Sequence, residues 1–163
     1  MGMSNIKRFA HWVYCKAGEP YLMPLLYAEQ RKQKGPVNER GVEYGYTLQE
    51  LSKLGGIEKV LDVGSGNSSF PHLLSYCGYK VTALDNMLQS WNEYWNDRPP
   101  TNRHFRIENS SIEYPKYIPS GFDAITCIST LEHIEQYELA LQNMAWLLRR
   151  GGHLILTLSL IHI

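Results

Sequence analysis

Two glycines and two acidic residues near the middle of the chain have the types and spacing that could hold a nucleoside. Residues 60–63 are short, partly β-branched and apolar except for Asp62, as is typical of a buried parallel strand, and Gly64 and Gly66 follow this run. Glycine lets the backbone turn tightly and lets a ligand lie against it. Roughly twenty residues later, Asp85 closes a second short apolar run, where a carboxylate could accept both hydroxyl hydrogens of a ribose. The spacing predicts a strand, helix, strand unit with a nucleoside site at its end.

Two further positions bear on the class of ligand. A dinucleotide-binding loop carries a third glycine where this chain has Ser69, which weakens the case for a pyrophosphate. Asp62, just before the glycines, can orient the loop and face a cationic amino or sulfonium group. A turn cap by Asp62 and a helix N-cap by Asp85 are the structural alternatives.

Three segments, in order along the chain, resemble the class I S-adenosylmethionine-dependent methyltransferases. Residues 60–66 (VLDVGSG) resemble motif I of that family, and residues 122–134 (FDAITCISTLEHI) resemble its fourth strand and the following loop. Residues 147–156 (LLRRGGHLIL) are similar to its helix, double-glycine turn and fifth strand. The resemblance implies S-adenosylmethionine as cofactor. It also implies a doubly wound, Rossmann-like α/β fold with a mostly parallel sheet in the order 3-2-1-4-5.

The resemblance assigns cofactor-binding roles to residues at or just after the predicted strands. They are Asp62, Gly64, Ser65, Gly66, Asp85, Asn86, Asn109, Ser110, Ile128 and Ser129. Those of motif I would hold the amino-acid part of the cofactor, and Asp85 the ribose. Asn109 stands where the family often has an acidic residue near the adenine, and an amide oxygen can still accept one hydrogen bond there.

Methyl transfer is an in-line displacement, so the protein supplies alignment, desolvation and in some cases a base. The resemblance places His133 beside the transfer site as a candidate catalytic base, and a structural hydrogen-bonding role is the alternative. Glu132, beside it, is expected on a solvated face. The other histidines show no metal-ligand spacing, so no metal site is predicted.

The expected acceptor is a small molecule, with sugars and other metabolites among the candidates. Residues 129–132 (STLE) replace an Asn-Pro-Pro-Tyr type sequence, which argues against methylation of the amino groups of nucleic-acid bases. A non-catalytic S-adenosylmethionine-binding module, or a fragment of a larger methyltransferase, is the main alternative. An NAD-dependent oxidoreductase is the third.

The elements that must position these residues form an N-terminal part and an α/β body. Residues 1–56 are predicted as a helical cap or lid, with helical periodicity over residues 40–54, and residues 57–163 as the cofactor-binding core of one structural domain. A helix after the glycine loop is predicted to bury Phe70, Leu73, Leu74 and Cys77 and to end at Gly78. A second amphipathic helix is predicted to bury Tyr137, Ala140, Leu141, Met144 and Leu148.

Several aromatic residues could take part in binding, although core packing is the favoured interpretation of each. Tyr44, which follows Glu43 in the predicted lid, could close over the cofactor. Trp91, Tyr94 and Trp95 lie in a predicted short helix after Asp85 and could grip a flat acceptor.

Composition limits the possible partners and compartments. The 163 residues include 16 basic and 16 acidic side chains and are 44% hydrophobic, which argues against nucleic-acid binding, disorder and a membrane span. The three cysteines are widely spaced and form no Cys-x-x-Cys, so free thiols in a reducing, cytoplasmic compartment are expected. Residues 1–8 lack the apolar region of a signal peptide.

The C-terminal side departs from the family pattern. Family members normally have seven strands, whereas this chain is expected to supply five, with residues 154–160 as the fifth. That would leave residues 154–161 as an apolar edge, which single-domain proteins usually cover or interrupt. We therefore expect either pairing with another chain, as in a homo-oligomer, or a fragment of a longer protein.

Overall fold

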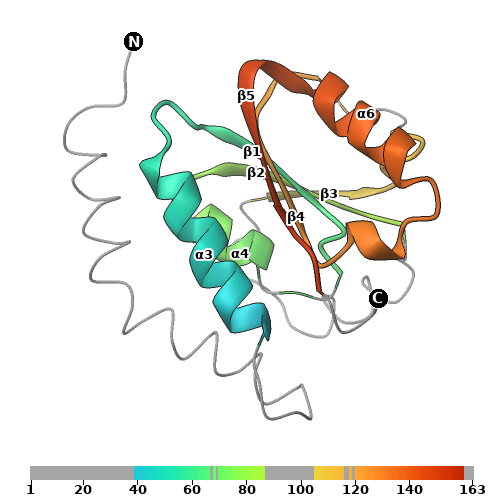
Figure 1. The fold of residues 1–163 in the computed structure, drawn as a ribbon. Helices are drawn as coiled ribbons and strands as arrows, with labels where there is room; N and C mark the ends of the chain where they lie inside the picture. The colour runs from blue at the N-terminus through green and yellow to red at the C-terminus, as the bar shows by residue number, and fades with distance from the viewer. Residues whose placement is uncertain are drawn as a thin grey trace.

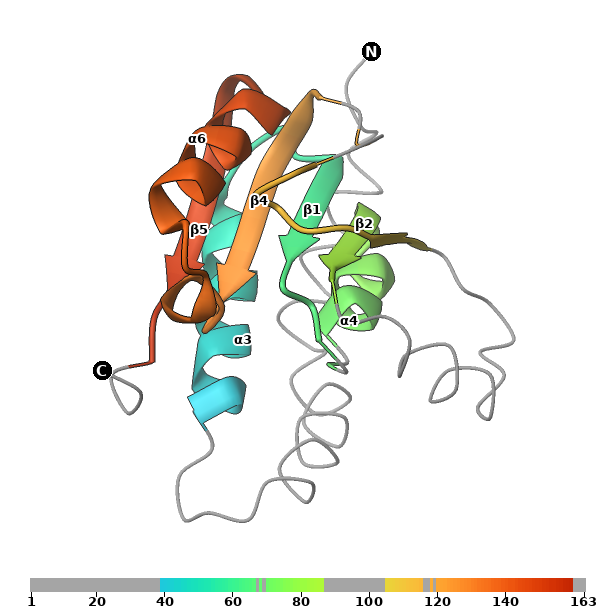
Figure 2. The ribbon, with the colours of Figure 1, turned by 90° about the vertical axis from the view of Figure 1, so that its right-hand side faces the viewer.

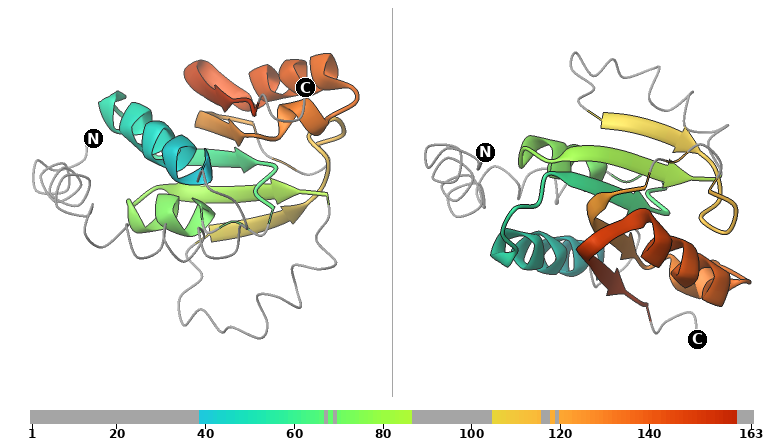
Figure 3. Two further views of the ribbon diagram at one scale, coloured as in Figure 1. Left: turned by 60° about the horizontal axis from the view of Figure 1, so that its bottom comes forward. Right: turned by 90° about the horizontal axis from the view of Figure 1, so that it is seen from above.

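The computed structural model describes residues 39–66, 68, 70–86, 105–115, 118 and 120–159. Within these ranges, an all-parallel sheet has the strand order β3-β2-β1-β4-β5 (Figure 2). The strands are β1 (Lys59–Val63), β2 (Lys80–Asp85), β3 (Phe105–Asn109), β4 (Phe122–Ile128) and β5 (Leu148–Thr157). Figure 3 shows β3 and β5 at the two edges. The predicted Rossmann-like α/β class and strand order are confirmed.

Helices cover both faces of the sheet (Figure 1). Helices α3 (Glu39–Lys53) and α4 (Phe70–Tyr76) lie on one face, and α6 (Tyr137–Leu147) lies on the other. A 3-10 helix, η1 (Leu131–His133), connects the end of β4 toward α6. Since parallel strands need crossover connections, helices on both faces are the expected arrangement.

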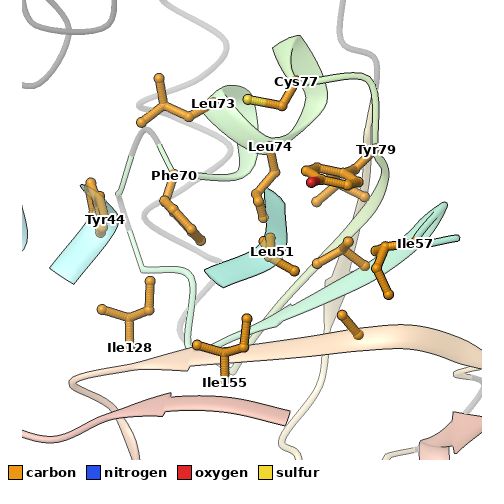
Figure 4. Packing of buried hydrophobic residues seen from close by; sticks show 13 residues of the cluster. Tyr44, Leu51, Ile57, Phe70, Leu73, Leu74, Cys77, Tyr79, Ile128 and Ile155 are labelled. Atoms are coloured by element: carbon orange, nitrogen blue, oxygen red, sulfur yellow. The ribbon is translucent and has the colours of Figure 1, made fainter. Parts of the chain in front are cut away.

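The core on the α3 and α4 face is built from the predicted helix stripes. Phe70, Leu73, Leu74 and Cys77 of the α4 segment are all buried, and Gly78 follows with a φ of 90°. From α3, Tyr44 is only 2% exposed and stacks on Phe70 with ring centroids 4.7 Å apart (Figure 4). Helix α3, part of the predicted cap, therefore packs directly on the α/β core.

The prediction for α6 is partly wrong. Ala140 and Met144 are fully buried, but Tyr137 is 52% exposed and Leu148 already belongs to β5. Leu147 occupies the last buried position of the helix. Periodicity identifies the buried face of a helix, but it does not show where along the helix contact with the sheet begins.

The fifth strand begins earlier than predicted. β5 starts at Leu148 rather than 154, and its register with β4 shifts so that Phe122 pairs with Leu148 and Ala124 with His153. The double glycine lies inside this irregularity, where a Cβ on Gly152 would come within 3.0 Å of the Arg149 carbonyl oxygen. The two glycines thus form a bulge within β5 instead of a turn before it.

Several predictions fall outside the described residues. These are the cap before residue 39, the helix with Trp91, Tyr94 and Trp95, the end of the apolar edge at residues 160 and 161, and Cys15. Cys77 and Cys127 are buried, and neither forms a disulfide. No helix in the part of the chain that the structure describes has the length and apolar character needed to cross a membrane.

Candidate functional site

A small hollow lies where β1 and β4 end against α3 and α4. We call it the hollow; its lining residues are Tyr44, Asp62, Gly64, Ser65, Ser68, Phe70 and Ile128. Four of these were predicted site residues, whereas the sequence did not assign Ser68 or Phe70 to the site. The cavity volume of the hollow is about 10 Å³, far below the roughly 300–1,000 Å³ of common ligand pockets, so these residues form only one part of a complete ligand site.

Asp62 lies in β1 under the hollow and is 1% exposed. Its Oδ1 accepts a hydrogen bond from the Thr126 hydroxyl of β4 at 2.7 Å, and the two residues are register partners in the sheet. A buried carboxylate needs such donors, because an uncompensated charge in the interior is costly. Thr126, which the sequence did not mark, therefore holds the acidic group of the site.

The glycine loop follows β1 and turns through two left-handed positions. Gly64 has a φ of 68° and Gly66 one of 48°. A Cβ on Gly64 would lie 2.1 Å from Cγ2 of Thr130, whereas one on Gly66 would meet nothing closer than the Gly64 oxygen at 3.9 Å. Gly64 is thus required by a contact within the protein, and only Gly66 leaves open space beside its backbone.

Asp85 ends β2 and holds the glycine loop in place. Its Oδ2 accepts the Gly66 N–H at 2.9 Å, and its carbonyl oxygen accepts the Ser110 N–H at 3.1 Å. Asp85 also pairs in register with Asn109, which is exposed, as is Asn86. The residues predicted for the ribose and adenine therefore lie together at the C-terminal ends of β2 and β3.

The end of β4 is tied to α3 and β5 through Ser129, a predicted cofactor-binding residue, and through Glu43 and Thr157, which the sequence did not assign to the site. Ser129 donates from its hydroxyl to Glu43 Oε1 at 2.5 Å, and Thr157 donates to the same oxygen at 2.8 Å. The Ser129 N–H donates to the Thr157 carbonyl oxygen at 3.1 Å and to its hydroxyl at 3.2 Å. Three elements therefore converge on one carboxylate beside Ile128.

The two residues next to the predicted transfer site differ in their surroundings. His133 is exposed in η1, where its backbone N–H donates to the Thr130 carbonyl oxygen. Glu132 is half-buried, with Oε1 accepting the Ser159 N–H at 2.8 Å and Oε2 out of contact with solvent. The expectation of a solvated Glu132 is wrong, because its carboxylate fastens the chain just after β5.

The two ends of the sheet differ in the pairing of their acidic side chains. Glu43, Asp62, Asp85 and Glu132 lie at or near the C-terminal ends of the strands, and none of the side chains lining the hollow is cationic. At the opposite ends, acidic side chains form ion pairs with cationic ones. There, Lys80 pairs with Glu58 at 2.7 Å, and Arg149 pairs with Asp123.

Two titratable groups have shifted pKa values for reasons that the fold supplies. Burial raises the pKa of Asp123, but hydrogen bonds from the Lys59 and Glu58 N–H groups and from Arg149 outweigh it and leave that pKa below its usual value. Burial, followed by the negative charges of Asp62 and Glu132, raises the pKa of the Cys127 thiol to about 12. Cys127 is therefore a neutral core thiol rather than a nucleophile.

Comparison with known proteins identifies the family to which this sequence is similar. Residues 19–162 match the model of a family described as "Methyltransferase domain". Glycine N-methyltransferase of Homo sapiens is 30% identical over 140 residues, which cover 75% of this chain and 48% of that protein. Ubiquinone biosynthesis O-methyltransferase of Proteus mirabilis is 30% identical over 101 residues, covering 59% and 40%. The chain thus spans about half the length, or less, of these relatives.

Solved structures show the same fold. N-methyltransferase NodS of Bradyrhizobium japonicum, solved in complex with S-adenosyl-L-homocysteine, has a TM-score of 0.60 at 24% identity. The similarity covers 72% of this chain and 60% of that one. YcgJ from Bacillus has a TM-score of 0.59 at 19% identity, covering 70% and 49%.

Proposed function

Because the chain belongs to the methyltransferase domain family, we propose that it binds S-adenosylmethionine at the hollow and transfers the methyl group to a small-molecule acceptor. The family match confirms the resemblance that motif I and the two later segments indicated. The family match, and the S-adenosyl-L-homocysteine bound to the structurally similar NodS, support S-adenosylmethionine as the cofactor and methyl transfer as the activity. The acceptor, and the activity of the whole protein, belong to the proposal.

The observation that carries the proposal is the acidic character of the hollow. Asp62 is buried in its wall, and no lysine or arginine is among its lining residues. S-adenosylmethionine brings a sulfonium and an ammonium, which a buried carboxylate favours at short range. The pyrophosphate of NAD would bring negative charge to the same position. The hollow therefore supports a cationic cofactor over a dinucleotide.

The residues present fit this cofactor. Gly66 leaves open space beside the loop, and Tyr44 and Phe70 give the hollow an aromatic side. Asp62 and the glycine loop would hold the amino-acid part, while Asp85 and Asn109 would hold the ribose and adenine. When bound, the cofactor supplies an electrophilic methyl group on a sulfonium.

The chain's own contribution is binding, alignment and exclusion of water. We assign the candidate base to His133, whose imidazole would hold the proton that an acceptor nitrogen or oxygen loses. His133 is exposed in η1, shortly after the C-terminal end of β4, so its side chain is accessible to an acceptor that enters from solvent. Two relatives are named for methylation at nitrogen and at oxygen of small molecules, which supports a small-molecule acceptor without fixing the atom.

Calorimetric titration of S-adenosylhomocysteine into the purified chain tests the proposal, with NADH as the control ligand. We expect micromolar binding of S-adenosylhomocysteine and none of NADH. Asp85→Ala should weaken binding at least about tenfold, because it removes a predicted ribose acceptor and the support of the Gly66 N–H. Preference for NADH would favour an oxidoreductase, and no binding by a chain shown to be folded would overturn the proposal.

A methyl-transfer assay separates the proposed function from the alternative of a non-catalytic binding module. Incubation of the chain with radiolabelled S-adenosylmethionine and a panel of small amines, phenols and sugars should give a labelled product for at least one acceptor. Cofactor binding without transfer to any of them would favour the binding module.

A further inference from the structure

The Glu43 carboxylate joins three elements at the rim of the hollow. It extends from α3, and its Oε1 accepts hydrogen bonds from the hydroxyl of Ser129, directly after β4, and from that of Thr157, the last residue of β5. The two neighbouring residues, Tyr44 and Ile128, both line the hollow. The position of two walls therefore depends on the same carboxylate.

Ser129 has a backbone conformation that needs support. Its φ of 43° is the only positive value at a non-glycine position in the part of the chain that the structure describes. Such conformations persist where surrounding contacts determine them fully, and they concentrate at functional sites. The N–H of Ser129 is held by Thr157 and its hydroxyl by Glu43, so both polar groups of the residue that could fix this turn are engaged.

The second oxygen of Glu43 argues against a role in stability alone. Oε2 is out of contact with solvent and has no hydrogen-bond partner among the described residues. A buried acceptor without a donor costs stability, and native proteins retain few of them. If Glu43 served only to hold α3 on the sheet, a neutral side chain at this position would make the protein more stable.

We infer that Glu43 is a positioning residue for the cofactor: through the Ser129 and Thr157 hydroxyls it sets the turn after β4 and the distance of α3 from it, and thereby the shape of the hollow. This inference rests on the proposed function, because the hollow is taken as the cofactor site. Glu43 is not among the residues lining the hollow, so it acts through Tyr44 and Ile128 rather than by contact.

Paired substitutions at Glu43 separate positioning from charge. Glu43→Gln keeps an oxygen that can accept both hydroxyls, and it should bind S-adenosylhomocysteine within about threefold of the wild-type chain. Glu43→Ala removes the acceptor and should weaken binding about tenfold or more. Glu50→Ala is the matched control, because Glu50 lies on the same helix, partly exposed and paired with Lys53. The control should bind as the wild type does.

A second pair keeps the test decisive if Glu43→Ala fails to fold. Thr157→Val removes the hydroxyl from Glu43 and Ser129 at nearly constant volume, whereas Thr157→Ser keeps it. We expect weaker binding only for the valine variant. Each titration is run on protein whose folded fraction has been established by urea unfolding, so loss of stability and loss of affinity are measured separately.

The outcomes distinguish this inference from the proposed function. If the wild type binds S-adenosylhomocysteine and both Glu43→Ala and Thr157→Val bind equally well once folded, Glu43 is only structural and the inference is overturned. If Glu43→Gln loses as much affinity as Glu43→Ala, the charge and not the positioning matters, and the inference is also overturned. A folded wild type that binds nothing overturns the proposed function, and this inference with it.

Discussion

The carboxylate of Asp62 accepts a hydrogen bond from the hydroxyl of Thr126 at 2.7 Å, and both side chains are buried between the central strands β1 and β4. Thr126 is not among the residues lining the hollow, so this contact holds the acidic group from within the sheet. Asp62 thus has a defined orientation before a cofactor arrives, as electrostatic preorganisation requires.

Replacement of Thr126 should therefore reduce stability out of proportion to its size. Thr126→Val keeps the volume but leaves a buried carboxylate without this donor, so we expect the free energy of unfolding to fall by about 1–3 kcal/mol. Thr126→Ser keeps the hydroxyl and should cost clearly less. Urea unfolding of the two variants measures the difference, and a valine variant as stable as the serine variant would contradict the role given to this bond.

Alanine substitutions at three glycines should rank by their local geometry. Gly64→Ala combines a left-handed φ of 68° with overlap against Thr130, so we expect a loss of at least about 3 kcal/mol. Gly66→Ala meets no close atom and should cost about 1–2 kcal/mol for its φ of 48°. Gly55→Ala, with open space, serves as control and should stay within about 0.5 kcal/mol. Urea unfolding measures the three losses of unfolding free energy. Equal losses at Gly64 and Gly66 would contradict the predicted order.

Asp123 should make stability depend on pH in the acid range. Its pKa in the folded protein lies below the ordinary 3.8, so its contribution is fully present above about pH 4 and is lost as the pH falls through the lower, folded value. Asp123→Asn should accordingly lower the urea midpoint at pH 7, and the gap between variant and wild type should narrow toward pH 3. Glu138→Gln, in the first turn of α6, is the control. A gap that is constant with pH would show that the Asp123 charge is irrelevant.

Cys127 should be unreactive in the folded chain. Its thiol is 0% exposed and its pKa is raised to about 12, so very little thiolate forms at pH 8.5. Alkylation with iodoacetamide followed by peptide mass spectrometry should leave Cys127 unlabelled in the native protein and labelled in guanidinium chloride. Rapid native labelling would indicate that β4 opens readily.

The sequence by itself determined the parts of this protein that repeat with a local period. The apolar runs of β1 and β4, the stripe of Phe70, Leu73 and Leu74 and the glycine loop are all local patterns, and the described structure reproduces them. The boundaries that failed, at Tyr137 and at the start of β5, depend on where a helix meets the sheet and on a register shift between strands.

Only the tertiary structure decided which side chains hold the site together. Glu43 reaches Ser129 across 86 positions and Thr157 across 114, and Thr126 reaches Asp62 across 64. No local period links such residues, because their distance is set by the parallel alignment of strands whose C-terminal ends meet at one edge of the sheet. The sequence thus indicated the family and the residues proposed to bind the cofactor, while the convergence of β1, β4, β5 and α3 determined which side chains hold them in place.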